Sequence, residues 1–184
     1  MFARLIPRGL ALCALLIVAG CSSVDPQEYR AQQPVLELQK YFSGTLEGHG
    51  MFMDRSGAVQ RRFVVTIKAS WAGDVGTLDE DFNWSDGKRE RRVWTLRKAG
   101  NDAQGTRWTG TADGVVGTAQ GVAVGNALNW TYAFDLKTDE GKQYRVDFDD
   151  WMFLIDDRVM LNRAWMTFYG VRVGELFISF RKLP

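Results

Sequence analysis

Three charged residues lie at positions where the alternation of the chain calls for apolar side chains. Glu80, Arg92 and Asp150 each fall in step with the apolar residues of their segments, not with the polar ones. Taking a single charge out of water costs several kcal/mol, so a charge placed in this way is usually paired or binds something. These three residues form the candidate interior polar cluster.

A hairpin that turns at residues 86–87 would bring two members of this cluster together. With a three-residue connection we expect Glu80 to lie opposite Trp94, which makes Glu80 and Arg92 diagonal neighbours on one face. This arrangement predicts a structural ion pair, with Asp150 as a second acceptor for the guanidinium group.

Aromatic side chains follow the same apolar pattern. Most of the seven tryptophans lie at the alternate positions of their segments that carry apolar side chains. Core packing is the first explanation for aromatic residues at such positions, and a cavity wall is a special case of it. A barrel of about eight strands can leave room for one small ligand, so a filled and a hollow interior both remain open. The candidate pocket wall consists of Trp84, Trp94, Trp130, Tyr132 and Phe148.

Histidine, cysteine and metal catalysis find little support in the sequence. His49 is the single histidine of the chain, which leaves a hydrolytic triad or a zinc site without partners. The acidic clusters lack the spacing of an EF-hand loop. We therefore predict no catalytic residue, no metal and no cofactor, with a Glu80–Asp150 acid and base pair as the alternative.

The first 20 residues have the three-part layout of a bacterial secretory signal. The apolar run at 10–18 is about half as long as the roughly 20 residues of a transmembrane helix. Residues 18–21 read Val-Ala-Gly-Cys and resemble a lipobox, in which the cysteine receives the lipid. We expect Cys21 to be lipidated, and Ser22 after it predicts the outer membrane, with the domain in the periplasm.

Composition limits what the remaining chain can be. Removing the signal takes Arg4 and Arg8 from the 23 basic residues, which leaves 21 against 22 acidic ones. This balance argues against a nucleic-acid partner. Residues 21–33 are polar and contain Pro26, so we predict a lipidated tether there and a single domain at 34–184.

The elements that position these residues are predicted to be β-strands. Alternation with a period of two is clear at 62–71 and 128–136, and further strands are expected near 44–53, 75–85, 90–98, 106–113, 115–124, 143–155, 158–168 and 171–182. Short turns separate them without intervening helices, which indicates an antiparallel meander. We predict an all-β, up-and-down, lipocalin-like barrel of roughly 8–10 strands. A short helix at 35–41, with Pro34 in its first turn, would close one end, and a two-sheet β-sandwich is the alternative.

Several stretches resemble the bacterial lipoprotein family DUF3833. They are Tyr41-Phe-Ser-Gly44, Phe52-Met-Asp-Arg-Ser-Gly57, Leu78-Asp-Glu-Asp-Phe82, Ser85-Asp-Gly87, Arg92-Val-Trp94, Gly125-Asn-Ala-Leu128 and Asp149-Asp-Trp-Met152. These stretches run in order from about residue 34 to the C-terminus. The resemblance implies a lipoprotein with a calycin-like barrel, no established activity or catalytic residues, and a lipid-related role at most.

Together these features predict a periplasmic lipoprotein of the outer membrane. Its partners would be the membrane, through the lipid anchor, and a hydrophobic or lipid-derived molecule that it binds without catalysis. Two alternatives remain: a hydrolase that uses the carboxylate pair, and a structural or adaptor protein of envelope assembly. A large apolar patch outside the barrel would favour the adaptor.

Overall fold

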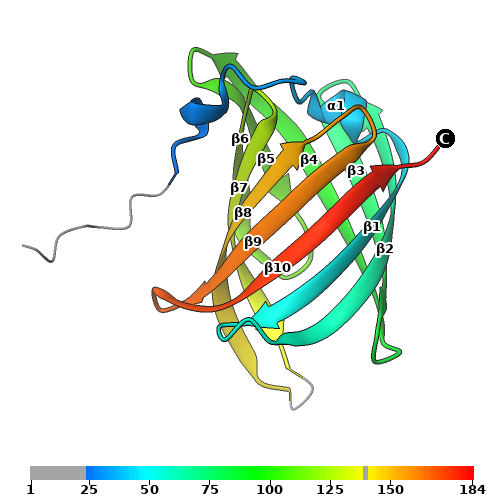
Figure 1. Ribbon diagram of the computed structural model, residues 1–184, viewed down its shortest axis with the longest axis vertical. Coiled ribbons are helices and arrows are strands. Elements are labelled where there is room, and N and C mark those ends of the chain that lie inside the picture. The colour runs from blue at the N-terminus through cyan, green and yellow to red at the C-terminus, as the bar shows by residue number, and fades with distance from the viewer. Residues whose placement is uncertain (1–23, 139–140) are drawn as a thin grey trace, which may run out of the picture.

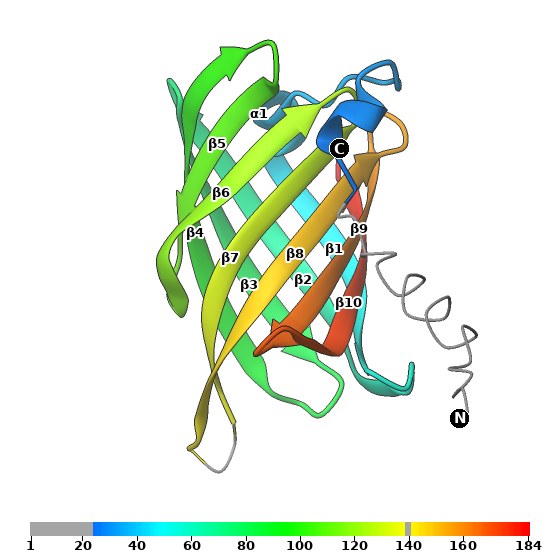
Figure 2. The same cartoon turned by 90° about the vertical axis from the view of Figure 1, so that its left-hand side faces the viewer.

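The computed structural model describes residues 24–138 and 141–184 and shows a closed barrel of ten antiparallel strands (Figures 1 and 2). The strands are β1 (Gly44–Asp54), β2 (Val59–Ala72), β3 (Val75–Trp84), β4 (Arg89–Asp102), β5 (Gly105–Thr111), β6 (Val115–Val124), β7 (Ala127–Lys137), β8 (Gln143–Leu154), β9 (Val159–Phe168) and β10 (Val171–Lys182). Each strand pairs with its neighbours in the chain, and β10 pairs with β1 to close the ring. The predicted barrel is confirmed, and the sandwich alternative is wrong.

Alternating burial explains why these segments form a barrel. Along β2, Phe63, Val65 and Ile67 are buried, whereas Arg62 and Lys68 on either side of this run are exposed. Successive side chains of a strand point to opposite faces, so one face of each strand lines the interior. Closing the ring pairs the backbone N–H and C=O groups of the first and last strands, which would otherwise be free to pair with other chains.

A single turn of helix covers one end of the barrel (Figure 1). This helix, α1 (Leu38–Tyr41), is shorter than the predicted 35–41. The reason is that the backbone N–H of Leu36 donates to the carbonyl of Gly125 at 2.7 Å, which keeps the preceding residues extended. Leu38 and Phe42 are both nearly fully buried beneath this cap.

The segment before α1 packs against the barrel, although the sequence predicted a tether at 21–33. It forms the 3₁₀ turn η1 (Pro26–Tyr29), whose Tyr29 ring lies 5.6 Å from the ring of Trp151 on the outside of β8. The side-chain amide of Gln27 also donates to the carbonyl of Gln104, at 2.6 Å. An aromatic ring on an outward-facing tryptophan supplies a contact that a polar stretch of sequence does not reveal. Cys21 and the predicted signal at 1–20 lie outside the described residues.

The core is concentrated near α1. The largest fully buried side chains are Leu38, Leu46, Val65, Ile67 and Met160. They fill the barrel at the end that α1 covers. Further from α1 the interior is lined by larger aromatic residues and is not filled, which leaves the cavity described below.

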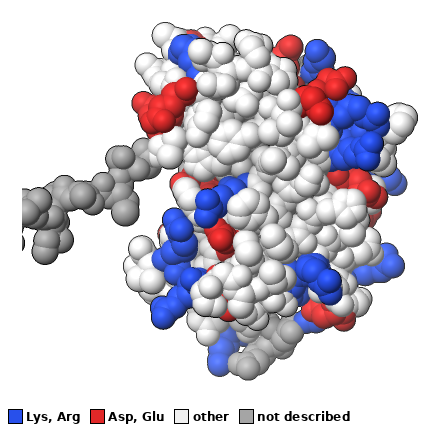
Figure 3. All heavy atoms as spheres, viewed as in Figure 1, with Lys and Arg blue, Asp and Glu red and all other residues white. Residues whose placement is uncertain are grey.

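The outer surface carries charges of both signs. On the face shown in Figure 3, basic and acidic side chains are interspersed over the strands. Arg163 and Glu175, for example, form an ion pair of 2.7 Å between β9 and β10. Within the described residues, no helix has the length and apolar character needed to cross a membrane.

Candidate functional site

The barrel encloses a cavity of about 810 Å³. Pockets that bind small molecules typically measure about 300–1,000 Å³. Leu38 and Phe42 line the cavity at the end that α1 covers. At the opposite end, which we call the mouth, the lining includes the exposed residues Asp113, Gly114 and Lys137. The interior is therefore hollow at one end and reaches the surface there.

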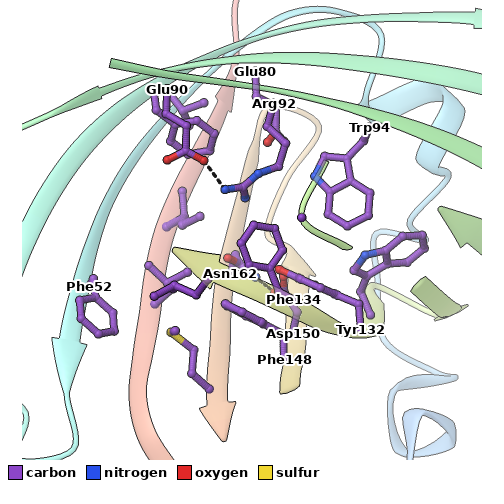
Figure 4. A pocket seen from close by; sticks show the side chains of 18 of the residues that line it. Phe52, Glu80, Glu90, Arg92, Trp94, Tyr132, Phe134, Phe148, Asp150 and Asn162 are labelled. Atoms are coloured by element: carbon purple, nitrogen blue, oxygen red, sulfur yellow. Dashed lines mark hydrogen bonds and ion pairs between the residues drawn. The ribbon is translucent and has the colours of Figure 1, made fainter. Parts of the chain in front are cut away.

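Aromatic rings make up much of the wall of this cavity (Figure 4). The five residues predicted for a pocket wall, Trp84, Trp94, Trp130, Tyr132 and Phe148, all line it. Tyr132 stacks on Phe148 across β7 and β8, with ring centres 4.8 Å apart and planes 4° apart. Trp94 lies edge-on to Tyr132 at 5.4 Å. The wall thus presents a continuous set of rings contributed by several strands.

Two glycines set the position of Trp130 in this wall. A Cβ atom at Gly110 or Gly121 would lie 2.5 Å or 2.2 Å from atoms of the indole ring, so neither position tolerates a side chain without a shift of the tryptophan. Glycine permits this close approach of a ring to the backbone. The wall therefore depends on β5 and β6 as well as on β7, which carries the tryptophan.

Glu80 and Arg92 both line the cavity, but their pairing differs from the expectation. The structure places them directly opposite each other on β3 and β4, two residues away from the predicted diagonal register. The expected three-residue connection, residues 85–87, is present, and the N–H of Trp84 donates to the carbonyl of Lys88 at 3.0 Å. Counting back from this closing pair puts Glu80 opposite Arg92, whereas the diagonal register would need a connection of five residues. A shift of two residues preserves the face, so both side chains still point inward (Figure 4).

The predicted ion pair between Glu80 and Arg92 is not formed within 4 Å among the described residues. Arg92 bonds instead to Glu90, at 2.5 Å, on its own strand and nearer the mouth. Glu90 is exposed, so its carboxylate keeps contact with water while it holds the guanidinium. Pairing there avoids the cost of desolvating both charges fully. Asp150, expected as a second acceptor for Arg92, has a different partner.

That partner is Asn162, a residue not predicted from the sequence. Asp150 and Asn162 are both buried, and the Asn162 amide donates to the Asp150 carboxylate and, at 3.1 Å, to the carbonyl of Trp151. Asn162 lies between Met160 and other inward residues of β9. Asn162 lies at a position where the alternation of its strand predicts an apolar side chain. The same signal identified Asp150, so Asn162 could have been found in that way.

Burial changes the acidity of both interior carboxyl groups. Burial raises the pKa of Glu80 to about 7, with the positive charge of Arg92 acting against it and the carboxylate of Asp150 adding to it. Burial also raises the pKa of Asp150 to about 7, and the hydrogen bond from Asn162 lowers it in part. Near pH 7 each group is therefore only partly ionised, and the charge of the cavity changes with pH.

A second arginine at the mouth was also missed. Arg61 lies over the ring of Trp84, 4.0 Å from its centre, and pairs with Asp86 at 2.8 Å. It stands two residues before Phe63, and this spacing was available in the sequence as a signal that it faces inward. Among residues 24–138 and 141–184, no group of three or more potential metal-ligating side chains is found.

Two solved structures share the fold of this chain. The first is a protein of unknown function from the DUF3598 family of Nostoc punctiforme, with a TM-score of 0.51 and 11% identity over 83% of this chain. This chain spans about half, 51%, of the length of that protein. The second is an S-type phycobiliprotein lyase from Guillardia theta, with a TM-score of 0.58 and 6% identity over 86% of this chain and 98% of the lyase. At these identities the likeness is one of fold.

No curated protein matches the chain. The family model described as "Protein of unknown function (DUF3833)" matches residues 15–182, nearly the full length of the sequence. This match covers every strand of the barrel and confirms the resemblance drawn from the short motifs. The chain belongs to the DUF3833 family.

Proposed function

We propose that this protein binds a hydrophobic or amphipathic molecule inside its barrel. The observation that carries the proposal is the cavity, which is about 810 Å³ in volume, is lined largely by aromatic and aliphatic side chains, and reaches the surface at the mouth. Covering apolar surface is favourable by about 25 cal/mol per Å², so an apolar ligand that fills this space gains free energy from the wall. A few polar groups within the wall would orient it.

The fold shared with one of the solved structures supports a role in binding another molecule. One barrel of the same fold is a phycobiliprotein lyase, a protein named for its action on other proteins. We carry over from this likeness only that such a barrel serves molecular recognition elsewhere. The identity of the ligand in this chain rests on its own wall residues.

Native mass spectrometry of the full chain, extracted from its host membrane in mild detergent, tests this proposal. We expect a bound mass that is released on unfolding. A matched pair on β10 serves as control: Leu176 lines the cavity, whereas Phe177 faces outward and is 38% exposed. Leu176→Trp should abolish the bound mass and Phe177→Trp should retain it. Absence of any bound mass in the unmodified chain, or equal retention in both variants, would contradict the proposal.

A second candidate function, hydrolysis by a carboxylate pair, is favoured by one observation. Glu80 and Asp150 line the same cavity and both have a pKa raised to about 7, a value suited to acid and base work near neutral pH. Incubation with an extract of the host membrane separates the two functions. A binding protein returns its ligand unchanged, whereas an enzyme returns fragments and stops doing so in Glu80→Gln.

We also propose that the barrel is anchored to the outer membrane through acyl chains on Cys21, with the domain in the periplasm. The support is the signal-like segment at 1–20, the lipobox-like residues 18–21, and Ser22 at the next position. Several acyl chains, at about 0.8 kcal/mol for each buried methylene, would make the attachment essentially permanent.

The variant Cys21→Ser tests the anchor. We expect it to remain uncleaved and unlipidated and to lack the mass of the acyl chains. Cys13→Ser is the matched control, because it removes the only other cysteine of the chain, which lies within the predicted signal. A Cys21→Ser protein that matures and acquires lipid like the unmodified chain would overturn the assignment.

A further inference from the structure

The charges inside the barrel are not balanced. At or near the mouth, three ion pairs each join one positive and one negative side chain, so their charges cancel: Arg61 with Asp86, Arg92 with Glu90, and Asp135 with Arg145. Glu80 and Asp150 lie on the wall without a cationic partner within ion-pair distance among the described residues, and the donor to Asp150 is the neutral amide of Asn162. When both are ionised, the middle of the cavity carries negative charge that Arg92, already paired with Glu90, compensates only in part.

Aromatic rings surround this negative charge. Trp94, Tyr132 and Phe148 line the same cavity as the two carboxyl groups (Figure 4). Burial raises the pKa of the Tyr132 hydroxyl well above its usual value, and the charges of Asp150 and Glu80 raise it further while Arg92 acts against them. The face of an aromatic ring attracts cations, and the attraction strengthens where water is excluded. Carboxylates set among ring faces are the groups that recognise an ammonium ion.

The protein already uses this chemistry for a cation of its own. The Arg92 guanidinium lies 5.4 Å from the ring centre of Phe82 and 4.9 Å from that of Phe134, while it bonds to the carboxylate of Glu90. The same combination of aromatic rings and carboxylates continues inward from Arg92, but there it binds no Lys or Arg of residues 24–138 or 141–184.

We propose that the ligand of this barrel carries a positively charged nitrogen on an apolar tail, and that Glu80 and Asp150 receive the charged group among Trp94, Tyr132 and Phe148. The inference rests on the proposed binding function and specifies its ligand class. The tail would lie along the apolar wall. Arg92, held by Glu90, would disfavour a second cation nearer the mouth.

Three probes with the same tail and different head groups test this inference: octyltrimethylammonium, octanol and octanoate. Calorimetric titration of the full chain in a neutral maltoside detergent measures each affinity, with detergent alone as reference. The alkyl tail of the detergent competes for the apolar wall with all three probes alike, because the probes share one tail. At pH 8 we expect octyltrimethylammonium to bind about tenfold more tightly than octanol, and octanoate to bind most weakly.

The dependence on pH gives a second readout. The groups that act on Glu80 are Arg92, Asp150, Glu90 and Asp79, and those that act on Asp150 are Asn162 and Asp149. Because both carboxyl groups lose protons around pH 7, raising the pH from 6 to 8 should strengthen octyltrimethylammonium binding. The charge of this probe does not titrate, so the change reports the protein alone. Octanol binding should stay constant.

Matched variants connect the preference to the two acids. Glu80→Gln and Asp150→Asn should each remove most of the preference for the cation and leave octanol affinity unchanged, which also shows that the cavity is intact. Asp81→Asn and Asp147→Asn, on the exposed faces of the same strands, remove an equal charge and should change nothing. Tightest binding of octanoate, or equal binding of all three probes, would overturn the inference and leave the proposed function standing. Failure of all three to bind would overturn both.

Discussion

At the scale of single residues, Glu80 and Asp150 are set apart from the surface acids by their surroundings. Hydrogen bonds and neighbouring cations hold the pKa below its usual value at Asp54, Asp79, Asp86, Asp135 and Asp156. Inside the barrel, burial acts in the opposite direction and raises the pKa of both interior carboxyl groups to about 7. A folded protein that holds protons more tightly than its unfolded chain loses stability as those protons leave.

This difference predicts how stability depends on pH without ligand. Between pH 5 and 8 the unfolded chain has already lost both protons while the folded barrel is still losing them, so the free energy of unfolding should fall as pH rises. The loss is about 2–3 kcal/mol for each group. Urea unfolding at pH 5 and pH 8 measures it. Glu80→Gln should reduce the loss by about half and Asp81→Asn should not, and an unchanged profile in Glu80→Gln would show that Glu80 does not titrate in this range.

At the scale of the elements, the N-terminal segment behaves as part of the barrel. Tyr29 packs 5.6 Å from Trp151 and 5.0 Å from Phe153, and the turn between β6 and β7 lies directly beneath the segment. A Cβ atom on Gly125 in that turn would come within 1.8 Å of the backbone oxygen of Tyr29. The glycine therefore allows the segment to dock and to cover the aromatic surface of β8.

Gly125→Ala should consequently destabilise the protein by forcing this segment away. Gly73→Ala is the matched control, because the two glycines have nearly equal φ angles, +55° and +57°, and a Cβ atom at Gly73 meets nothing within 4 Å. Both variants share the cost of a left-handed alanine, roughly 1 kcal/mol. Gly125→Ala should lose about 1–3 kcal/mol more in urea unfolding, since overpacking adds to the strain. Equal losses would mean that the docked segment contributes nothing to stability.

At the scale of the whole molecule, the docked segment and the mouth lie at opposite ends of the barrel (Figure 2). The segment bonds to the turn between β4 and β5, on the side of α1, whereas the hairpin between β9 and β10 is at the mouth. Pro26 lies five residue steps beyond Cys21, and a chain spans at most about 3.5 Å per residue. A lipid on Cys21 therefore holds the covered end within roughly 17 Å of the membrane.

This geometry predicts that the mouth faces away from the anchoring membrane. Single fluorophores on Gln104→Cys, at the covered end, and on Tyr169→Cys, 90% exposed at the mouth, report the orientation in vesicles. With Cys21 acylated and Cys13 removed with the signal, as proposed, each new cysteine would be the only free thiol. A quencher carried by the lipid head groups should quench position 104 strongly and position 169 weakly. The reverse order would mean that the mouth faces the bilayer and takes its ligand from it.

The strands, and the faces on which their residues lie, were largely predictable from the sequence. Alternation with a period of two is a local property, so it placed Glu80, Arg92 and Asp150 inward before any pairing between strands was known. A register error of two residues at the β3–β4 hairpin changed the partners but not the face. The same rule would also have revealed Arg61 and Asn162.

Only the tertiary structure decided which groups meet and how much space remains. The choice of Glu90 by Arg92 and of Asn162 by Asp150 depends on distances and on access to water, which alternation does not encode. The hollow interior depends on how ten strands close and how the rings pack between them, because volume is a property of the whole barrel. Docking of residues 26–32 depends on an aromatic surface formed by residues more than a hundred positions away.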